Sequence, residues 1–101
     1  MKKTSLLIAA CAILASASPA MADGNVRCGG GPRAGWKSLA SVQQALKAQG
    51  WTIKKVKPEN DCYEVYGKTP EGLNVEAFFH PVTLKKVRVL QRGRVIFPAP
   101  K

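Results

Sequence analysis

The stretch 38–79 constrains the fold of this chain more than any other part of its sequence. Apolar residues recur at helical spacing from Ser38 to Gln49, and Gly50 follows as a left-handed C-cap, so we expect a short amphipathic helix there. Apolar and polar residues then alternate, which predicts three strands separated by turns, at Trp51–Lys57, Cys62–Lys68 and Leu73–Phe79. One helix followed by antiparallel strands predicts an α+β fold with the helix on one face of the sheet.

The remaining strand pattern is less regular. The segment Lys85–Phe97 also alternates, which fits either a fourth strand with a basic outer face or a hairpin that turns at Gln91–Gly93. We favour a strand at Lys85–Leu90, followed by a turn and a short extended tail, which gives a sheet of three to four strands. In the first strand, Val56 breaks the alternation, which predicts a β-bulge near Lys54–Lys55.

The first residues are typical of a cleaved secretory signal, which we place at residues 1–22. A positive start is followed by an apolar run, Ser5–Ala17, and by the A-x-A site that ends at Ala22. The run is short, rich in Ala and Ser, and followed by Pro19, which argues against a transmembrane anchor. Lipoprotein processing at Cys11 is a weaker alternative, because it would leave almost no apolar region ahead of the cysteine. We therefore expect a periplasmic or secreted protein, cleaved at about Ala22.

Two cysteines, Cys28 and Cys62, follow the predicted cleavage site. An even pair in a small exported domain predicts a structural disulfide, which would stabilise the fold by about 3–4 kcal/mol. The pair forms no C-x-x-C motif and has no added His ligands, so a redox or metal role is not favoured. The bond would tether a glycine-rich irregular arm, residues 23–37, to a domain that spans 38–97, and we expect the tail 98–101 to be disordered.

The chain carries a formal net charge of +10, or +8 without the two lysines of the predicted signal. This surplus favours anionic partners: acidic proteins, lipid headgroups or polyanionic glycans, with specific nucleic acid the least expected for an exported protein. Catalytic and metal-binding sets are not apparent. The single histidine, His80, precedes a proline, and Glu76 is the only close acidic residue on its strand. We expect no cofactor, no metal and no enzymatic activity.

From Ala40 to about Arg94 the order of motifs resembles the PepSY domain. The segments that carry this resemblance are Val42–Leu46, Gly50–Ile53, Lys55–Val56, Tyr63–Val65, Glu71–Glu76 and Pro81–Thr83. His80 stands where the family usually has Asp, and Leu84 where it usually has Gly, so the family's tight glycine turn is unsupported here. The resemblance implies an exported or cell-envelope module, related to propeptides that are thought to hold thermolysin-type metallopeptidases in check, with no catalytic residues of its own.

One helix covers one face of a sheet, so we expect the opposite face to be solvated or to meet a partner. The partner-binding residues predicted there are Tyr66, Phe78, Lys86, Arg88, Arg92 and Arg94. The competing interpretation is that Glu64 and Glu76 form ordinary cross-strand ion pairs with Lys86 and Arg88.

Three functions compete. The first is a non-enzymatic module that docks an envelope or secreted protein, a peptidase among the candidates, through the open sheet face or an edge strand. The alternative is a basic protein that binds polyanions or a membrane surface mainly through charge. An enzyme or metal protein that uses His80 is the weakest of the three.

Overall fold

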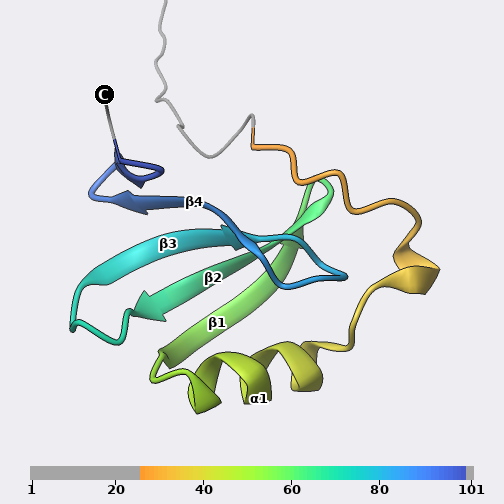
Figure 1. Ribbon diagram of the computed structural model, residues 1–101, viewed down its shortest axis with the longest axis horizontal. Helices are drawn as coiled ribbons and strands as arrows, with labels where there is room; N and C mark the ends of the chain where they lie inside the picture. The colour runs from red at the N-terminus through yellow and green to blue at the C-terminus, as the bar shows by residue number, and fades with distance from the viewer. Residues whose placement is uncertain (1–25, 100–101) are drawn as a thin grey trace, which may run out of the picture.

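The computed structural model describes residues 26–99, so the predicted signal and its cleavage site lie outside the described residues. Figure 1 shows a single helix beside one antiparallel sheet. The strands follow one another in space in chain order, from β1 to β5. The elements are a 3₁₀ turn η2 (Arg33–Gly35), α1 (Leu39–Ala48), β1 (Thr52–Glu59), β2 (Cys62–Lys68), β3 (Asn74–Phe79), β4 (Lys86–Gln91) and β5 (Arg94–Phe97). Among these residues no helix is long and apolar enough to span a bilayer.

The predicted helix is confirmed to within one residue at each end. Ser38 is the N-cap, and its hydroxyl accepts a hydrogen bond from the Ser41 amide at 3.1 Å. At the other end Gly50 has φ +102°, and the Trp51 amide donates to the Leu46 carbonyl at 3.0 Å. These are the features of a Schellman C-cap, in which glycine takes the left-handed position.

The sheet has five strands, so the expected three to four is too few. The segment predicted to be an extended tail pairs with β4 as β5, and the hairpin interpretation is the correct one. Its two central residues, Arg92 and Gly93, have φ +51° and +78°, as two-residue hairpin turns of the primed type require. The bulge predicted in β1 is confirmed, because its register shifts between Ile53 and Lys55.

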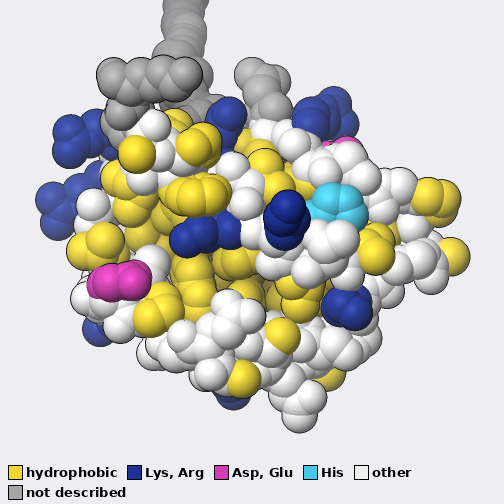
Figure 2. Space-filling view, in the orientation of Figure 1, with side chains coloured by type: hydrophobic (Ala, Val, Ile, Leu, Met, Phe, Trp, Pro, Cys, Tyr) yellow, Lys and Arg dark blue, Asp and Glu magenta, His cyan; other side chains and the backbone are white. Residues whose placement is uncertain are grey.

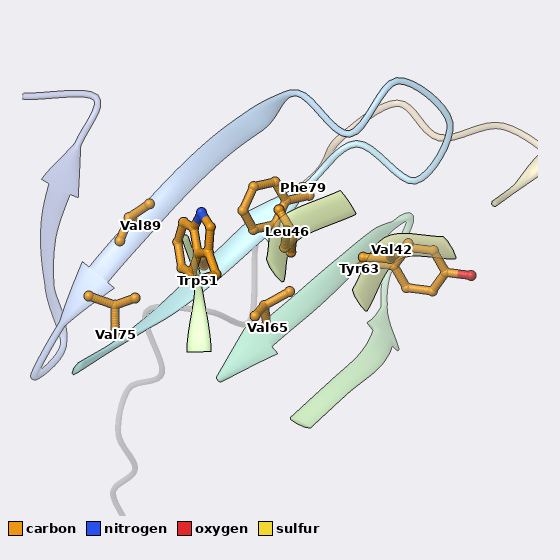
Figure 3. Packing of buried hydrophobic residues seen from close by; sticks show 9 residues of the cluster. Val42, Leu46, Trp51, Tyr63, Val65, Val75, Phe79 and Val89 are labelled. Atoms are coloured by element: carbon orange, nitrogen blue, oxygen red, sulfur yellow. The ribbon is translucent and has the colours of Figure 1, made fainter. Parts of the chain in front are cut away.

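Two apolar cores lie on opposite faces of the sheet. On the helix face, α1 packs against inward-facing residues of β2, β3 and β4, and Trp51 packs edge-on against Phe79 with ring centroids 5.5 Å apart. Figure 3 shows Val42 and Tyr63 at one end of this cluster and Val75 and Val89 at the other. The buried members of the cluster are Val42, Leu46, Trp51, Tyr63, Val65, Val75, Ala77, Phe79 and Val89.

The second core lies beneath the N-terminal arm, for which the structure describes residues 26–37. The predicted disulfide between Cys28 and Cys62 is present, and it fixes the arm against β2. The buried members are Val26, Cys62, Phe78 and Leu90, with Cys28, Val87 and Val95 packed around them. We call this side of the sheet the arm face. The expectation that the face opposite the helix is wholly open is therefore wrong, because the arm covers part of it.

The turn between β3 and β4 keeps a tight form despite its two departures from the family pattern. The His80 ring nitrogen Nδ1 accepts hydrogen bonds from the Val82 and Thr83 amides at 3.1 and 3.2 Å. An aspartate carboxylate makes the same local bonds in an Asx turn. Leu84 takes φ +62°, the left-handed region that glycine would occupy. His80 therefore acts as a structural acceptor within this turn.

Candidate binding surface

The structure distributes the six predicted partner-binding residues over both faces of the sheet. Phe78 is fully buried beneath the arm, so its proposed place on an exposed surface is wrong. Lys86 lies opposite Phe79 in the ladder and therefore belongs to the helix face. The others divide in the same way: Tyr66 and Arg88 on the arm face, Arg92 in the hairpin turn, and Arg94 opposite Gln91 toward the helix face. These six residues do not form one contact surface.

The arm face holds a buried polar cluster centred on Glu64. This side chain is fully buried, and its carboxylate lies 3.7 Å from the Lys57 ammonium of β1. Both Glu64 oxygens, and Nε of Arg88, have no hydrogen-bond partner among the described residues. Glu64 thus forms its ion pair with Lys57. The competing interpretation, in which Glu64 pairs with Lys86 or Arg88, is wrong for this residue.

Burial changes the protonation chemistry of this cluster. It raises the pKa of Glu64 from 4.5 to about 7, because the charged form loses water and because Glu76 lies nearby. Burial also raises the pKa of Tyr66, and the neighbouring Glu64 carboxyl raises it further. The surroundings of Glu64 therefore favour the protonated form of a carboxyl group in β2, a strand that is paired on both sides.

Two of the predicted residues do line a common hollow. Tyr66 and Arg92 border a depression of about 320 Å³ at the hairpin end of the arm face. Its other lining residues are Lys54, Gly67, Asn74, Val75, Glu76 and Leu90. Because lysine and arginine share this hollow with Glu76, it has no uniform charge.

A second hollow lies on the helix face, where α1 ends and the hairpin of β4 and β5 begins. We call it the groove. It has a volume of about 310 Å³. Its lining residues are Gln49, Trp51, Thr69, Pro70, Glu71, Leu73, Lys86, Val89, Ile96 and Phe97. Figure 2 shows hydrophobic side chains gathered between the hairpin and the helix, with Lys and Arg side chains around and among them.

The groove has a buried floor and exposed apolar walls. Trp51 and Val89 are 7% and 3% exposed, whereas Leu73 and Phe97 are 40% and 36% exposed. The two wall residues come from opposite sides, Leu73 from the β2–β3 turn and Phe97 from β5. The turn is held by hydrogen bonds between Thr69 and Leu73, so this wall is a fixed part of the fold.

The β4–β5 hairpin contributes one basic residue, Lys86, to the lining of the groove. The segment 85–97 contains five basic residues and no acidic one: Lys85, Lys86, Arg88, Arg92 and Arg94. The Lys86 ammonium lies 4.5 Å from the centre of the Phe97 ring. The ion pairs that the structure shows within residues 26–99 join Lys57 to Glu59 and Glu64. Lys86 and Arg94 therefore have no carboxylate partner among the described residues.

Metal chemistry has no support in residues 26–99, where no three His, Cys, Asp or Glu side chains come together as a ligand set. The groove is the feature that sequence reasoning missed. Its signal was the pair of apolar residues at the end of the chain, Ile96 and Phe97, which a disordered or merely extended tail would not require.

A family model described as peptidase propeptide and YPEB domain matches residues 6–89. The chain belongs to the PepSY family. The match covers α1, the first three strands and part of β4, and ends at Val89, so β5 lies beyond it. Family membership identifies a propeptide-like, peptidase-related type of module that is typically extracytoplasmic. No curated protein and no solved structure matches the chain.

Proposed function

We propose that this protein is a non-catalytic PepSY module that docks another exported or cell-envelope protein, with a peptidase as the leading candidate. The family description names peptidase propeptides, which makes a peptidase the leading class of partner. The observation that carries the proposal is the groove, because exposed apolar side chains such as Leu73 and Phe97, with polar residues around them, are typical of a protein contact site.

The test is affinity capture of the disulfide-bonded protein on its own envelope fraction, at low and at high salt. We expect a defined protein to be retained at both salt concentrations, because burial of apolar surface is not screened by ions. Lys86→Glu should weaken capture if the groove faces the partner, because Lys86 lines it, whereas Arg27→Glu, at an exposed arginine of the arm, is the matched control for net charge. Failure to retain any protein at either salt concentration would contradict the proposal.

A second function, binding to polyanions or an anionic membrane surface, is supported by the net charge of +10. It predicts retention on heparin or on anionic vesicles that collapses as salt rises through physiological strength. It also predicts that Lys86→Glu and Arg27→Glu weaken retention to a similar degree, because only total charge matters. Unequal effects of these two variants would favour the protein-docking function.

A further inference from the structure

The groove is large enough to take one large side chain. Its volume of about 310 Å³ is near the lower limit of small-molecule pockets, ~300 Å³. Its floor, Trp51 and Val89, is already packed into the helix-face core. An apolar side chain that entered between Leu73 and Phe97 would extend that core outward, as an anchor residue does at a protein interface.

The two sides of the groove differ in charge. Lys86 lines the hairpin side, and Arg94 belongs to the strand that forms this side. Glu71 lines the opposite side, in the β2–β3 turn. A segment that follows the hairpin side therefore gains from carboxylates next to its apolar anchor, and it loses if a carboxylate is placed against Glu71.

We propose that the groove takes an apolar side chain from an acidic segment of the partner protein, with the flanking carboxylates directed to Lys86 and Arg94. This inference rests on the proposed function and names the chemistry of the segment that it recognises. A second copy of this chain that docked hairpin to hairpin is a poor occupant, because it would bring Lys86 and Arg94 against the same two cations.

The probe is a short synthetic peptide with one Phe between pairs of Glu, titrated against the ¹⁵N-labelled, disulfide-bonded protein and followed by amide shifts. We expect shifts at Leu73, Val89 and Phe97, and no saturable binding for the peptide with Lys in place of Glu or Ala in place of Phe. Shifts centred on Tyr66 and Arg92, in the hollow of the arm face, would overturn the proposal, and so would equal binding of the Lys peptide.

Variants on the two sides of the groove should act in opposite directions. Lys86→Gln should lower the affinity for the acidic peptide by about twofold to fivefold. Glu71→Gln should raise this affinity by a similar factor, about twofold to fivefold. Leu73→Ser should lower the affinity for the peptide on the order of tenfold, since the substitution removes an apolar wall of the groove. Leu39→Ser is the matched control, because Leu39 is 44% exposed but does not line the groove. Equal effects of the two leucine variants would overturn the proposal.

The remaining outcomes separate this inference from the proposed function. If the peptide fails to bind while the Leu73→Ser protein still captures the envelope partner, the groove is not the site of binding. The proposed docking function then stands. If neither peptide nor envelope protein binds, both are wrong. Concentration-dependent dimerisation that Leu73→Ser abolishes would assign the groove to a second copy. Binding to anionic vesicles that Leu73→Ser abolishes would assign it to lipid.

Discussion

The helix face is covered by regular secondary structure, whereas the arm face is covered by an irregular chain segment. The helix α1 makes its own backbone hydrogen bonds and has a cap at each end. In the described part of the arm, residues 26–37, regular backbone bonding is not found beyond the short turn η2. The arm is held instead by the Cys28–Cys62 bond and by Asp61, whose carboxylate accepts from the Cys28 and Gly29 amides at 2.8 Å each. A covalent bond and local side-chain acceptors thus replace periodic structure on one side of a very small domain.

The largest difference between the faces should appear when the disulfide is removed. The double variant Cys28→Ala, Cys62→Ala should lower the free energy of unfolding by about 3–4 kcal/mol, because the closed loop spans 34 residues. Urea unfolding measures the loss. Hydrogen exchange should accelerate at Val26 and at the amides of Cys28 and Gly29, which Asp61 binds.

The control for that prediction lies within the same exchange experiment. Amides of α1, such as Val42 and Leu46, should lose protection only through global unfolding, since the helix does not depend on the arm for its hydrogen bonds. If helix and arm amides exchanged at the same rate in the double variant, α1 and the arm would unfold as one cooperative unit. The claim that the two faces are held independently would then be wrong.

The second prediction concerns the pH dependence of stability, which Glu64 should dominate between pH 4.5 and about 7. Its folded pKa of about 7 is higher than 4.5, so the folded protein holds a proton that the unfolded chain releases in this window. Stability should therefore fall by about 1–3 kcal/mol as the pH rises through the window. Urea midpoints at about pH 5 and about pH 8 measure this fall.

Glu64→Gln should abolish most of the fall, because the amide does not titrate, and Glu59→Gln should retain it. The titration of Asp61 falls below the pH window of Glu64 and does not contribute to this fall in stability. Its pKa is lowered from 3.8, chiefly by the hydrogen bond from the Cys28 amide, so its stabilisation is lost only as the pH falls below that value. An unchanged pH dependence in Glu64→Gln would show that the buried carboxyl is not the cause.

The smallest effect comes from a matched pair of valines, one on each face. Val26 and Val42 are 2% and 0% exposed, and Val→Ala at either should cost about 1–2 kcal/mol in the oxidised protein. After reduction of the disulfide, Val26→Ala should cost close to nothing, because the arm is already released. Val42→Ala should keep its full cost. Urea unfolding of both variants, with and without reductant, makes the comparison, and equal costs under reduction would contradict it.

The fold was predicted well wherever a periodic pattern met a clear stop signal. The helix follows from its apolar spacing, Ser38 and Gly50, and β2 has its predicted bounds. The hairpin was one of two interpretations but not the favoured one, and its turn, Arg92–Gly93, has arginine at the first left-handed position. Sequence signals for such turns favour asparagine, aspartate or glycine there.

The candidate site was predicted less well, because an irregular segment that packs on a sheet has no periodic pattern by which the sequence could reveal it. Nothing periodic marks the arm, and only Val26 and Cys28 indicate that it packs on the sheet. A signal was nevertheless present: Phe78 and Leu90 are large apolar residues on the side of the strands that was expected to be open. Apolar residues on both sides of a strand indicate a sheet covered on both faces. The apolar pair Ile96 and Phe97 was a signal that this segment packs, but the shape of the groove could not be predicted, since its walls come from a turn and a hairpin whose spatial relation depends on the whole sheet.

The route of the arm has a consequence for how the molecule is assembled. A side chain at Gly30 would overlap Pro81 and the Asp61 carbonyl, so the arm passes closely against two turns that belong to different hairpins. Those turns, and the apolar floor beneath Val26, exist only after β2, β3 and β4 have paired. The surface on which the first described residues dock is therefore made by strands that come much later in the chain.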